Sequence, residues 1–251
     1  SAAVPRHQEP DLIRTIIEAT APVVVHASAG VGKTVFATRI ASNLPTGSTC
    51  ILYDCFGNGQ YRNASGYRHR HKDALVQIAN ELAAKGLCHL LIPTSHADAS
   101  AYIRAFVHRI SQAATIVRLS TPRALLCIVV DAADNAQMAA EEIGEARSFV
   151  RDLIREVMPE NVRLIFLCRS HRQAQLDPPV EAIRLELQAF NREETSAYLR
   201  LQFPDATGQD IDEFHRLSSH NPRVQALALS RNDTLSNTLR LLGPNPTTVE
   251  D

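Results

Sequence analysis

The sequence has no tryptophan, and no apolar run approaches the roughly 20 residues that a membrane-spanning helix needs. Its first residues lack the apolar segment of a signal peptide. Its five cysteines form no C-x-x-C pair, which is typical of reduced, packed thiols in a cytosolic protein. The formal net charge is only −1, so no global basic field indicates nucleic acid. We therefore expect a cytoplasmic globular protein without a membrane or nucleic-acid partner.

The 251 residues, 45% of them hydrophobic, provide enough core for one or two domains. The most informative stretch is VVVHASAGVGKTVFATRIASN, residues 23–43. Three valines predict a strand, a turn of small residues follows, and an amphipathic helix opens on Lys33 and Thr34. A strand, a small-residue turn and a helix that begins with Gly-Lys-Thr are typical of the phosphate loop of P-loop nucleotidases.

The chemistry expected of this loop follows from its backbone. Its N–H groups form an anion-binding nest, to which the next helix adds its own N-terminal donors. Lys33 would reach the β- and γ-phosphates, and the hydroxyl of Thr34 would bind Mg²⁺. We expect nucleotide binding by Ser28, Ala29, Gly30, Val31, Gly32, Lys33, Thr34 and Val35.

One position departs from the G-x-x-x-x-G-K-[ST] pattern, because its first glycine is Ala27 here. Alanine adds only a methyl group, so the turn survives if the dihedral angles of this residue stay in an ordinary region. The alternative to a nucleotide site is a glycine-rich turn whose lysine is merely solvated.

Strands and helices alternate up to residue 189. Apolar patterns predict strands at Val23–His26, Cys50–Asp54, Ala124–Asp131, Val162–Cys168 and Ile183–Leu187. Helical periodicity predicts helices at 10–17, Lys33–Leu44, 73–85 (capped by Asp73), Ser100–Arg118 and Glu141–Met158. This alternation implies right-handed crossovers and a three-layer α/β fold with a five-stranded parallel sheet. The continuously apolar strand at 124–131 should be central, and the alternating one at 183–187 should lie at an edge.

After residue 190 only helices are expected. Asn191 and Glu194 are spaced as a capping box. Further helices are predicted at Ile211–Leu217, Pro222–Leu229 and Thr234–Leu242. We therefore predict a P-loop α/β domain at residues 1–189 and a small helical domain at 190–251.

Three polar residues follow predicted strands and are candidates for chemistry. Asp131 ends a central strand, where a carboxylate can hold Mg²⁺ opposite Thr34; the alternative is an ordinary turn residue. Asp134 is the nearest carboxylate after it, and is either a catalytic base that positions water or an N-cap of the next helix. Arg169 is either a catalytic arginine that senses the γ-phosphate or a surface arginine.

A basic segment, RHRHK at residues 68–72, has no assigned place in this scheme. It lies near phosphates or a partner, or it is a solvated surface loop.

Lys33 and Thr34, the D-x-x-D-N of 131–135 and the Cys-Arg-Ser of 168–170 together resemble a STAND-class NTPase, the group that contains NACHT and NB-ARC proteins. The resemblance covers about residues 10–230. It implies a helical domain whose G-x-P-type motif places a proline against adenine, which points to Pro222 in the His-Asn-Pro of 220–222. It also implies rest with ADP bound and ATP-driven homo-oligomerisation.

The sequence departs from this family pattern, and from that of vigorous ATPases in general, in several features. Ala132 stands where vigorous ATPases carry a glutamate, and Asn135 replaces the glutamate of D-x-x-D-E, which predicts slow hydrolysis. His220 or Asn221 replaces the glycine of G-x-P. The winged-helix domain of the family does not follow Leu242, so we expect the NTPase module of a longer protein.

The resulting interpretation is an ATP-binding, slowly hydrolysing switch from a larger signalling or immune sensor, for example in antiviral defence. ATP is expected rather than GTP because no N-K-x-D motif is present. Two alternatives stay open: a small-molecule kinase with Arg62, Arg68 and Arg70 in a substrate lid, and a scaffold that binds nucleotide without turnover.

Overall fold

The computed structural model describes residues 4–60, 63 and 66–243. The chain divides into two compact units. The sheet unit comprises residues 13–26 and 34–186. The helical unit comprises, among the described residues, 4–12, 27–33 and 187–243. The predicted domain boundary near residue 189 stays a prediction, and the two units are described separately.

Five strands form the parallel sheet in the order β2-β3-β4-β1-β5. They are β1 (Val23–Ala27), β2 (Thr49–Asp54), β3 (Leu126–Asp131), β4 (Val162–Arg169) and β5 (Ile183–Glu186). Every residue of β3 is buried, as expected for a strand covered on both faces. β5 lies at an edge and alternates between half-buried and exposed residues. These strands confirm the predicted fold class.

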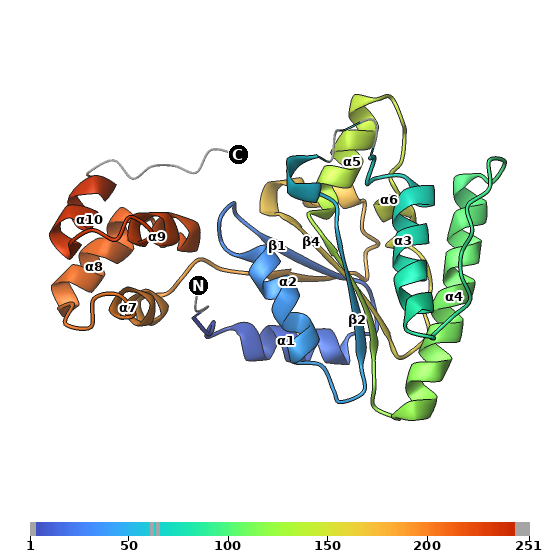
Figure 1. Cartoon of the computed structure of the whole chain (residues 1–251), viewed down its shortest axis with the longest axis horizontal. Helices are drawn as coiled ribbons and strands as arrows, with labels where there is room; N and C mark the ends of the chain where they lie inside the picture. The colour runs from blue at the N-terminus through green and yellow to red at the C-terminus, as the bar shows by residue number, and fades with distance from the viewer. Residues whose placement is uncertain (1–3, 61–62, 64–65, 244–251) are drawn as a thin grey trace. The chain divides into compact units, whose positions relative to one another are not determined.

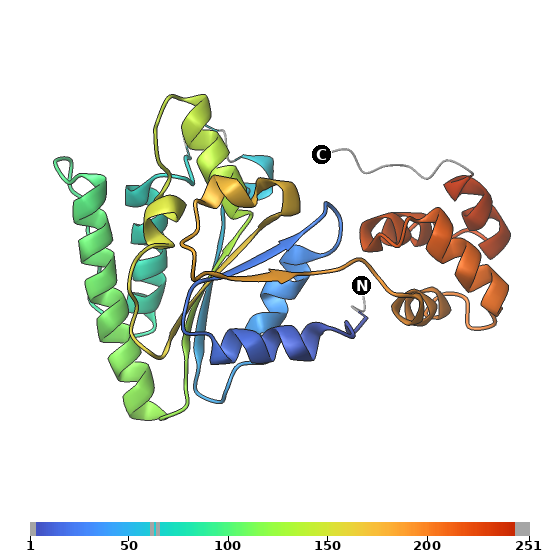
Figure 2. The same ribbon diagram turned by 180° about the vertical axis from the view of Figure 1, so that it is seen from behind.

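Helices cover both faces of the sheet (Figures 1 and 2). The helices up to β4 are α1 (Glu9–Glu18), α2 (Lys33–Ser42), α3 (His71–Ala84), α4 (Ala99–Ser120), α5 (Ala133–Glu142) and α6 (Phe149–Leu153). Two 3₁₀ segments are η1 (Gly57–Gly59) and η2 (Ser170–Leu176). The faces of α3, α4 and α6 share one apolar core with the strands. In Figure 1, α1 and α2 lie across the sheet from α3 and α4, which gives the three-layer arrangement.

Two local predictions are wrong. The expected helix at 141–158 is replaced by α5, a linker and α6. Because α5 buries mainly alanine, it lacks the periodic large side chains by which a helix is recognised, and Gly144 with φ +76° follows its end. In addition, Asp73 does not cap α3, since the N-cap residue is Arg70 and Asp73 lies in the first turn.

The helical unit contains α7 (Arg192–Arg200), α8 (Gly208–Leu217), α9 (Pro222–Leu229) and α10 (Leu235–Leu242). Asn191 and Glu194 form the predicted capping box at α7, and Pro222 is the first residue of α9, as predicted. The helices share a separate apolar core around the fully buried Phe214. Among all helices of the described residues, none is long and apolar enough to cross a membrane.

Candidate nucleotide-binding site

The phosphate loop runs from the end of β1 to the start of α2. Ala27, the residue in place of the first glycine, is fully buried at the end of the strand and has no positive φ. Its extended backbone explains why alanine is tolerated there. Gly30 and Gly32 have φ of +76° and +103°, values that require glycine. The loop therefore has the alternating backbone conformation from which anion nests are made.

The side chain of Lys33 folds back over the backbone of the phosphate loop. Its Nζ donates hydrogen bonds of 3.2 Å each to the carbonyl oxygens of Ala27 and Ser28. Ser28, Ala29 and Val31 complete the loop, and Val31 is buried. A cation held at the loop by two carbonyls can turn to phosphate oxygens when an anion enters.

Thr34 and Asp131 are brought together in the sheet unit, 97 residues apart in sequence. The Thr34 hydroxyl donates a 2.6 Å hydrogen bond to Oδ2 of Asp131, whose Oδ1 accepts the N–H of Ala132 at 2.8 Å. Asp131 ends the buried β3 and is itself only 4% exposed. A hydroxyl beside a carboxylate is a donor set that suits Mg²⁺ when phosphate oxygens and water complete the octahedron. Val35, the next residue after Thr34, is half exposed on α2.

A second carboxylate lies at the end of the neighbouring strand. Asp54 is aligned with Asp131 across β2 and β3. Its two oxygens accept the N–H groups of Phe56 and Gly57 at 2.8 and 2.9 Å, so this carboxylate closes a turn. Of the two aligned carboxylates, Asp131 is therefore the one placed beside the hydroxyl of Thr34.

Asp134 lies in the first turn of α5 and is 2% exposed. The N-cap residue of this helix is Ala132, in the left-handed region at φ 52°, so the N-cap alternative for Asp134 is wrong. The Oδ2 atom of Asp134 lies 3.6 Å from the guanidinium of Arg172 on η2. Sequence reasoning missed Arg172, because nothing local connects it to a carboxylate on another element.

Arg169 is the last residue of β4 and is partly buried. Arg169, Thr34 and Asp131 all belong to the sheet unit. The hydroxyl of the next residue, Ser170, lies 2.9 Å from Nδ1 of His26 on β1. The Cys-Arg-Ser motif thus ends β4 at the carboxyl edge of the sheet, the edge at which such folds bind ligands.

Pro222, the predicted adenine contact, opens α9 in the helical unit. The turn before it holds Ser219 and His220 at φ 52° and 62°. His220 therefore adopts the left-handed conformation that glycine takes most easily, and its ring stacks on His215 at 3.8 Å between centroids. The position of the G-x-P glycine is thus taken by a histidine in a left-handed backbone conformation.

Most of the basic segment is paired within the sheet unit, so it is not simply a solvated loop, and a place near phosphates or a partner stays a prediction. His69 and His71 are buried, 1% and 8% exposed. His69 and Arg70 bind the two carboxylate oxygens of Glu145 at 2.7 and 2.8 Å. His71 lies 2.7 Å from Asp152. Within the sheet unit, His69, Arg70 and His71 therefore already have carboxylate partners, while Lys72 is exposed.

The same contacts bear on the kinase alternative. Arg68 lies over the ring of Tyr53 and donates to the carbonyl oxygen of Asp54, while Arg70 is held by Glu145. Arg62 lies outside the described residues. The two described arginines of the proposed substrate lid are therefore engaged in packing and ion pairs.

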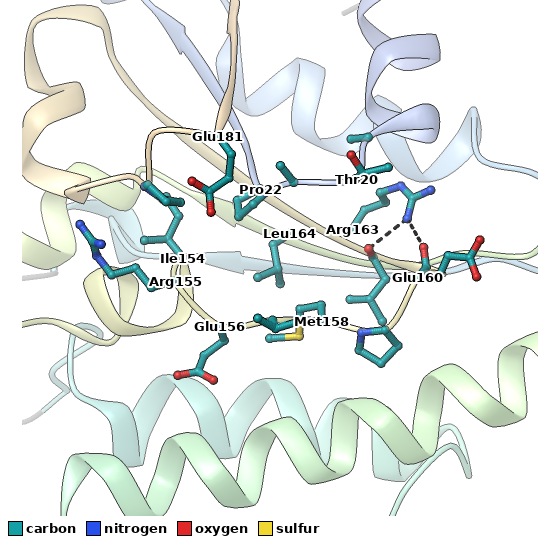
Figure 3. A pocket seen from close by; sticks show the side chains of 16 residues that line it. Thr20, Pro22, Ile154, Arg155, Glu156, Met158, Glu160, Arg163, Leu164 and Glu181 are labelled. Carbon is teal, nitrogen blue, oxygen red and sulfur yellow. Dashed lines mark hydrogen bonds between the residues drawn. The ribbon is translucent and has the colours of Figure 1, made fainter.

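A hollow of about 410 Å³ lies at the opposite edge of the sheet (Figure 3). Pro22, Ile154, Met158 and Leu164 point into it, and Arg163 beside it donates to the carbonyl of Glu160. Pro22 precedes β1, Ile154 and Met158 precede β4, and Leu164 lies near its start. The hollow is therefore at the amino edge, away from the carboxyl edge where nucleotides bind in such folds.

This chain resembles a known protein family and several solved structures. The model of the NACHT domain family matches residues 21–206. No curated protein matches the chain. A solved Drosophila ORC structure bound to DNA has a TM-score of 0.52 and 14% identity, over 94% of this chain and 65% of that one.

A second similar structure is a STAND protein with a tetratricopeptide repeat sensor from Pyrococcus horikoshii. It has 14% identity and a TM-score of 0.49 over 96% of this chain. The present chain spans about a third of the length of that protein, 33%. At 14% identity the ORC structure shows the fold alone. The family match covers most of the sequence and confirms the resemblance that the motifs indicated. The chain belongs to the NACHT family.

Proposed function

We propose that this chain is an ATP-binding, slowly hydrolysing switch module of a larger STAND-type signalling or immune sensor. The observation that carries the proposal is the phosphate loop. Its glycines stand at φ +76° and +103°, and its sequence continues directly into Lys33 and Thr34. Such a loop is a nest for the phosphates of a nucleotide.

In this proposal each residue of the loop has a distinct task. The N–H groups of residues 28–33 and of Val35 bind phosphate oxygens, and Lys33 moves from its two carbonyl partners to the β- and γ-phosphates. Thr34 and Asp131 hold Mg²⁺, which neutralises phosphate charge when bound. Pro222 packs against adenine.

Slow hydrolysis is proposed from the surroundings of the carboxylates. Ala132 stands directly after Asp131 and offers no carboxylate to orient water. Asp134, the proposed base, is 2% exposed and lies 3.6 Å from the guanidinium of Arg172, so it has to leave this partner before it can orient a water molecule. Because phosphoryl transfer depends on positioning and electrostatics, this arrangement lowers the rate while leaving binding intact. Arg169 senses the γ-phosphate.

The wider context of the switch is part of the same proposal. The resemblance implies ADP-bound rest, ATP-driven homo-oligomerisation and a cytoplasmic role in antiviral defence. The match to a longer STAND protein with a repeat sensor, of which this chain covers 33%, supports an NTPase module within a larger chain.

Measurements of Mg-ATP binding and of single-turnover Mg-ATP hydrolysis by this 251-residue chain test the proposal. The parent should bind Mg-ATP and Mg-ADP and turn over slowly. Asp134→Asn should abolish turnover with binding retained, and Arg169→Ala should weaken ATP affinity while ADP affinity is unchanged. Absence of nucleotide binding in the parent would refute the proposed function.

Two other outcomes identify the alternatives. Nucleotide binding without any turnover, in the parent as in Asp134→Asn, would identify a binding-only scaffold. That outcome has a structural basis, because the proposed base, Asp134, is already paired with Arg172. Transfer of phosphate to a nucleoside or sugar would identify a kinase.

A further inference from the structure

The carbonyl groups of the phosphate loop follow an unusual pattern. The five consecutive carbonyl oxygens from Ala27 to Val31 each accept a hydrogen bond from a side chain or backbone group of the helical unit. Lys33 supplies the first two bonds, as described above. The other three donors are far away in sequence, so the motif itself does not account for them.

These three distant donors are the amide of Asn221, the backbone N–H of Arg223 and the guanidinium of Arg6. Asn221 Nδ2 donates to the carbonyl of Ala29 at 2.9 Å. The N–H of Arg223 donates to the carbonyl of Gly30 at 3.2 Å, and Arg6 donates to that of Val31 at 3.1 Å. The start of α9 and the N-terminal segment thus hold successive peptide groups of the loop.

The planarity of the peptide bond gives this pattern a consequence. In a trans peptide the C=O of one residue and the N–H of the next point in opposite directions. Carbonyls held by these three donors therefore turn the N–H groups of Gly30, Val31 and Gly32 away from the donors. Within the part of the chain that the structure describes, those three N–H groups donate no hydrogen bond. They are available to an anion.

We propose that Asn221 and Arg6 are positioning residues, which orient the phosphate loop by holding its carbonyls so that its N–H groups face the nucleotide. This inference rests on the proposed nucleotide-binding function. Under this proposal, the affinity of the loop for phosphate depends on the contacts that the start of α9 makes with the loop carbonyls.

Asn221 is suited to this task because both polar atoms of its side-chain amide form hydrogen bonds. Its Oδ1 caps α9 by accepting the N–H groups of Arg223 and Val224 at 2.9 and 3.4 Å, which fixes the amide so that Nδ2 points at the loop. The approach is close, since a Cβ on Gly30 would lie 2.6 Å from Oδ1 of Asn221. A glycine at position 30 is thus required by its neighbour as well as by its φ.

Arg6 is held in place by independent contacts. Its guanidinium lies 4.7 Å from the centre of the Phe190 ring and also donates to the carbonyl of Gln188. Glu194, whose carboxylate is 3.8 Å from Arg6 Nε, accepts the N–H of His7 at 2.6 Å. A donor fixed on several sides loses little entropy on binding Val31, so its bond to the loop is favoured.

The test is the substitution Asn221→Ser, measured as the Kd of Mg-ADP by titration calorimetry. Serine is a good N-cap and is neutral, so it retains the helix cap while removing the amide that reaches Ala29. One lost hydrogen bond corresponds to an affinity about two- to tenfold weaker. The matched control is Asn191→Ser, the same change at the N-cap of α7, whose side chain accepts from Glu194 instead of donating to the loop. It should leave Kd unchanged.

A second measurement does not need nucleotide. In the ligand-free protein, the carbonyl ¹³C resonance of Ala29 should move in Asn221→Ser and stay in place in Asn191→Ser. Arg6→Lys provides an independent variant. It should weaken the binding of Mg-ADP in the same way, because lysine lacks the guanidinium fork.

Several results would overturn the inference. An Asn221→Ser protein with parental Kd would do so, as would an equal loss of affinity in Asn191→Ser, which would indicate general softening of the unit. An unmoved Ala29 resonance would also contradict it. If the parent itself binds no nucleotide, the positioning role and the proposed function both fail, whereas a failure of the variants alone leaves the function standing.

Discussion

Two segments of this chain look suited to anions, and the structure treats them in opposite ways. The phosphate loop, residues 27–34, contains a single lysine, whereas the basic segment, residues 68–72, contains five basic or imidazole side chains. In the loop, backbone N–H groups remain available within the described residues because the carbonyls are the groups that are bound. In the basic segment, Glu145 and Asp152 already occupy Arg70, His69 and His71.

The difference shows that anion binding depends on unsatisfied donors rather than on the number of positive charges. A charged group that already has a carboxylate partner gains little from a phosphate, because it must give up a bond of similar strength. Partial burial by itself raises the pKa of the Glu145 carboxyl, but hydrogen bonds from Arg70 and His69 lower it below its usual value overall. The basic segment therefore serves the stability of the sheet unit.

The largest expected effect separates the two segments directly. Mg-ATP or Mg-ADP at about 100 times its Kd should stabilise the parent by roughly 2.7 kcal/mol, an upward shift in Tm of about 5–10 °C. Lys33→Ala should abolish most of this shift. Lys72→Ala, at an exposed position of the basic segment, should retain it. A full shift in Lys33→Ala, measured by differential scanning fluorimetry, would contradict the assignment.

The next effect concerns the metal. Asp131→Asn removes a charge with little change in shape, so the fold should persist while affinity for ATP in the presence of Mg²⁺ falls about tenfold or more. Affinity in EDTA should change much less. Asp54→Asn is the matched control, since this aligned carboxylate closes a turn. Equal Mg²⁺ dependence in the parent and Asp131→Asn would make Asp131 a structural residue.

A smaller effect belongs to the basic segment. Glu145→Gln should lower the free energy of unfolding by about 1 kcal/mol, because the carboxylate is partly exposed and screened. That corresponds to a fall in Tm of about 2–4 °C, with the nucleotide-induced shift unchanged.

The pH dependence of this effect has a definite sign. The folded-state pKa of Glu145 lies below the usual 4.5, so its contribution is present above that pH and is lost as the pH falls through the folded-state pKa. The parent should therefore lose its advantage over Glu145→Gln in acid. An altered nucleotide shift in this variant would show that the basic segment acts on the site after all.

The smallest effect is expected in the helical unit. Partial burial lowers the pKa of His215 below 6.5, with the neighbouring His220 adding to the shift. Below about pH 6.5 the unfolded chain then binds more protons than the folded one. The free energy of unfolding should therefore decrease as the pH is lowered through this range. Neutral His215 accepts the hydroxyl proton of Thr195, whose oxygen takes the amide of Gln225, a network that a charged ring would disturb.

The substitution His215→Gln should reduce the loss of Tm between pH 7 and pH 5. His171→Gln, at an exposed position, is the control and should leave the slope as in the parent. An unchanged slope in His215→Gln would place the pH sensitivity elsewhere.

The sequence by itself determined the elements that depend on neighbours along the chain. The apolar runs of β3 and β4, the edge position of β5, the capping box at Asn191 and the phosphate loop are all encoded within about ten residues. The exception is α5, whose buried face consists mainly of alanine and therefore carries little periodic signal.

The tertiary structure alone decided the pairs that join distant segments. Arg172 with Asp134, Glu145 with the basic segment, and Asn221 with the loop carbonyl of Ala29 link residues that no motif relates. Hydrophobic periodicity specifies which face of an element is buried, but which polar side chains meet depends on the packing of separate elements. A loop motif encodes glycines for its own backbone, whereas the donors that hold its carbonyls come from distant segments, as Asn221 does, 192 residues from Ala29.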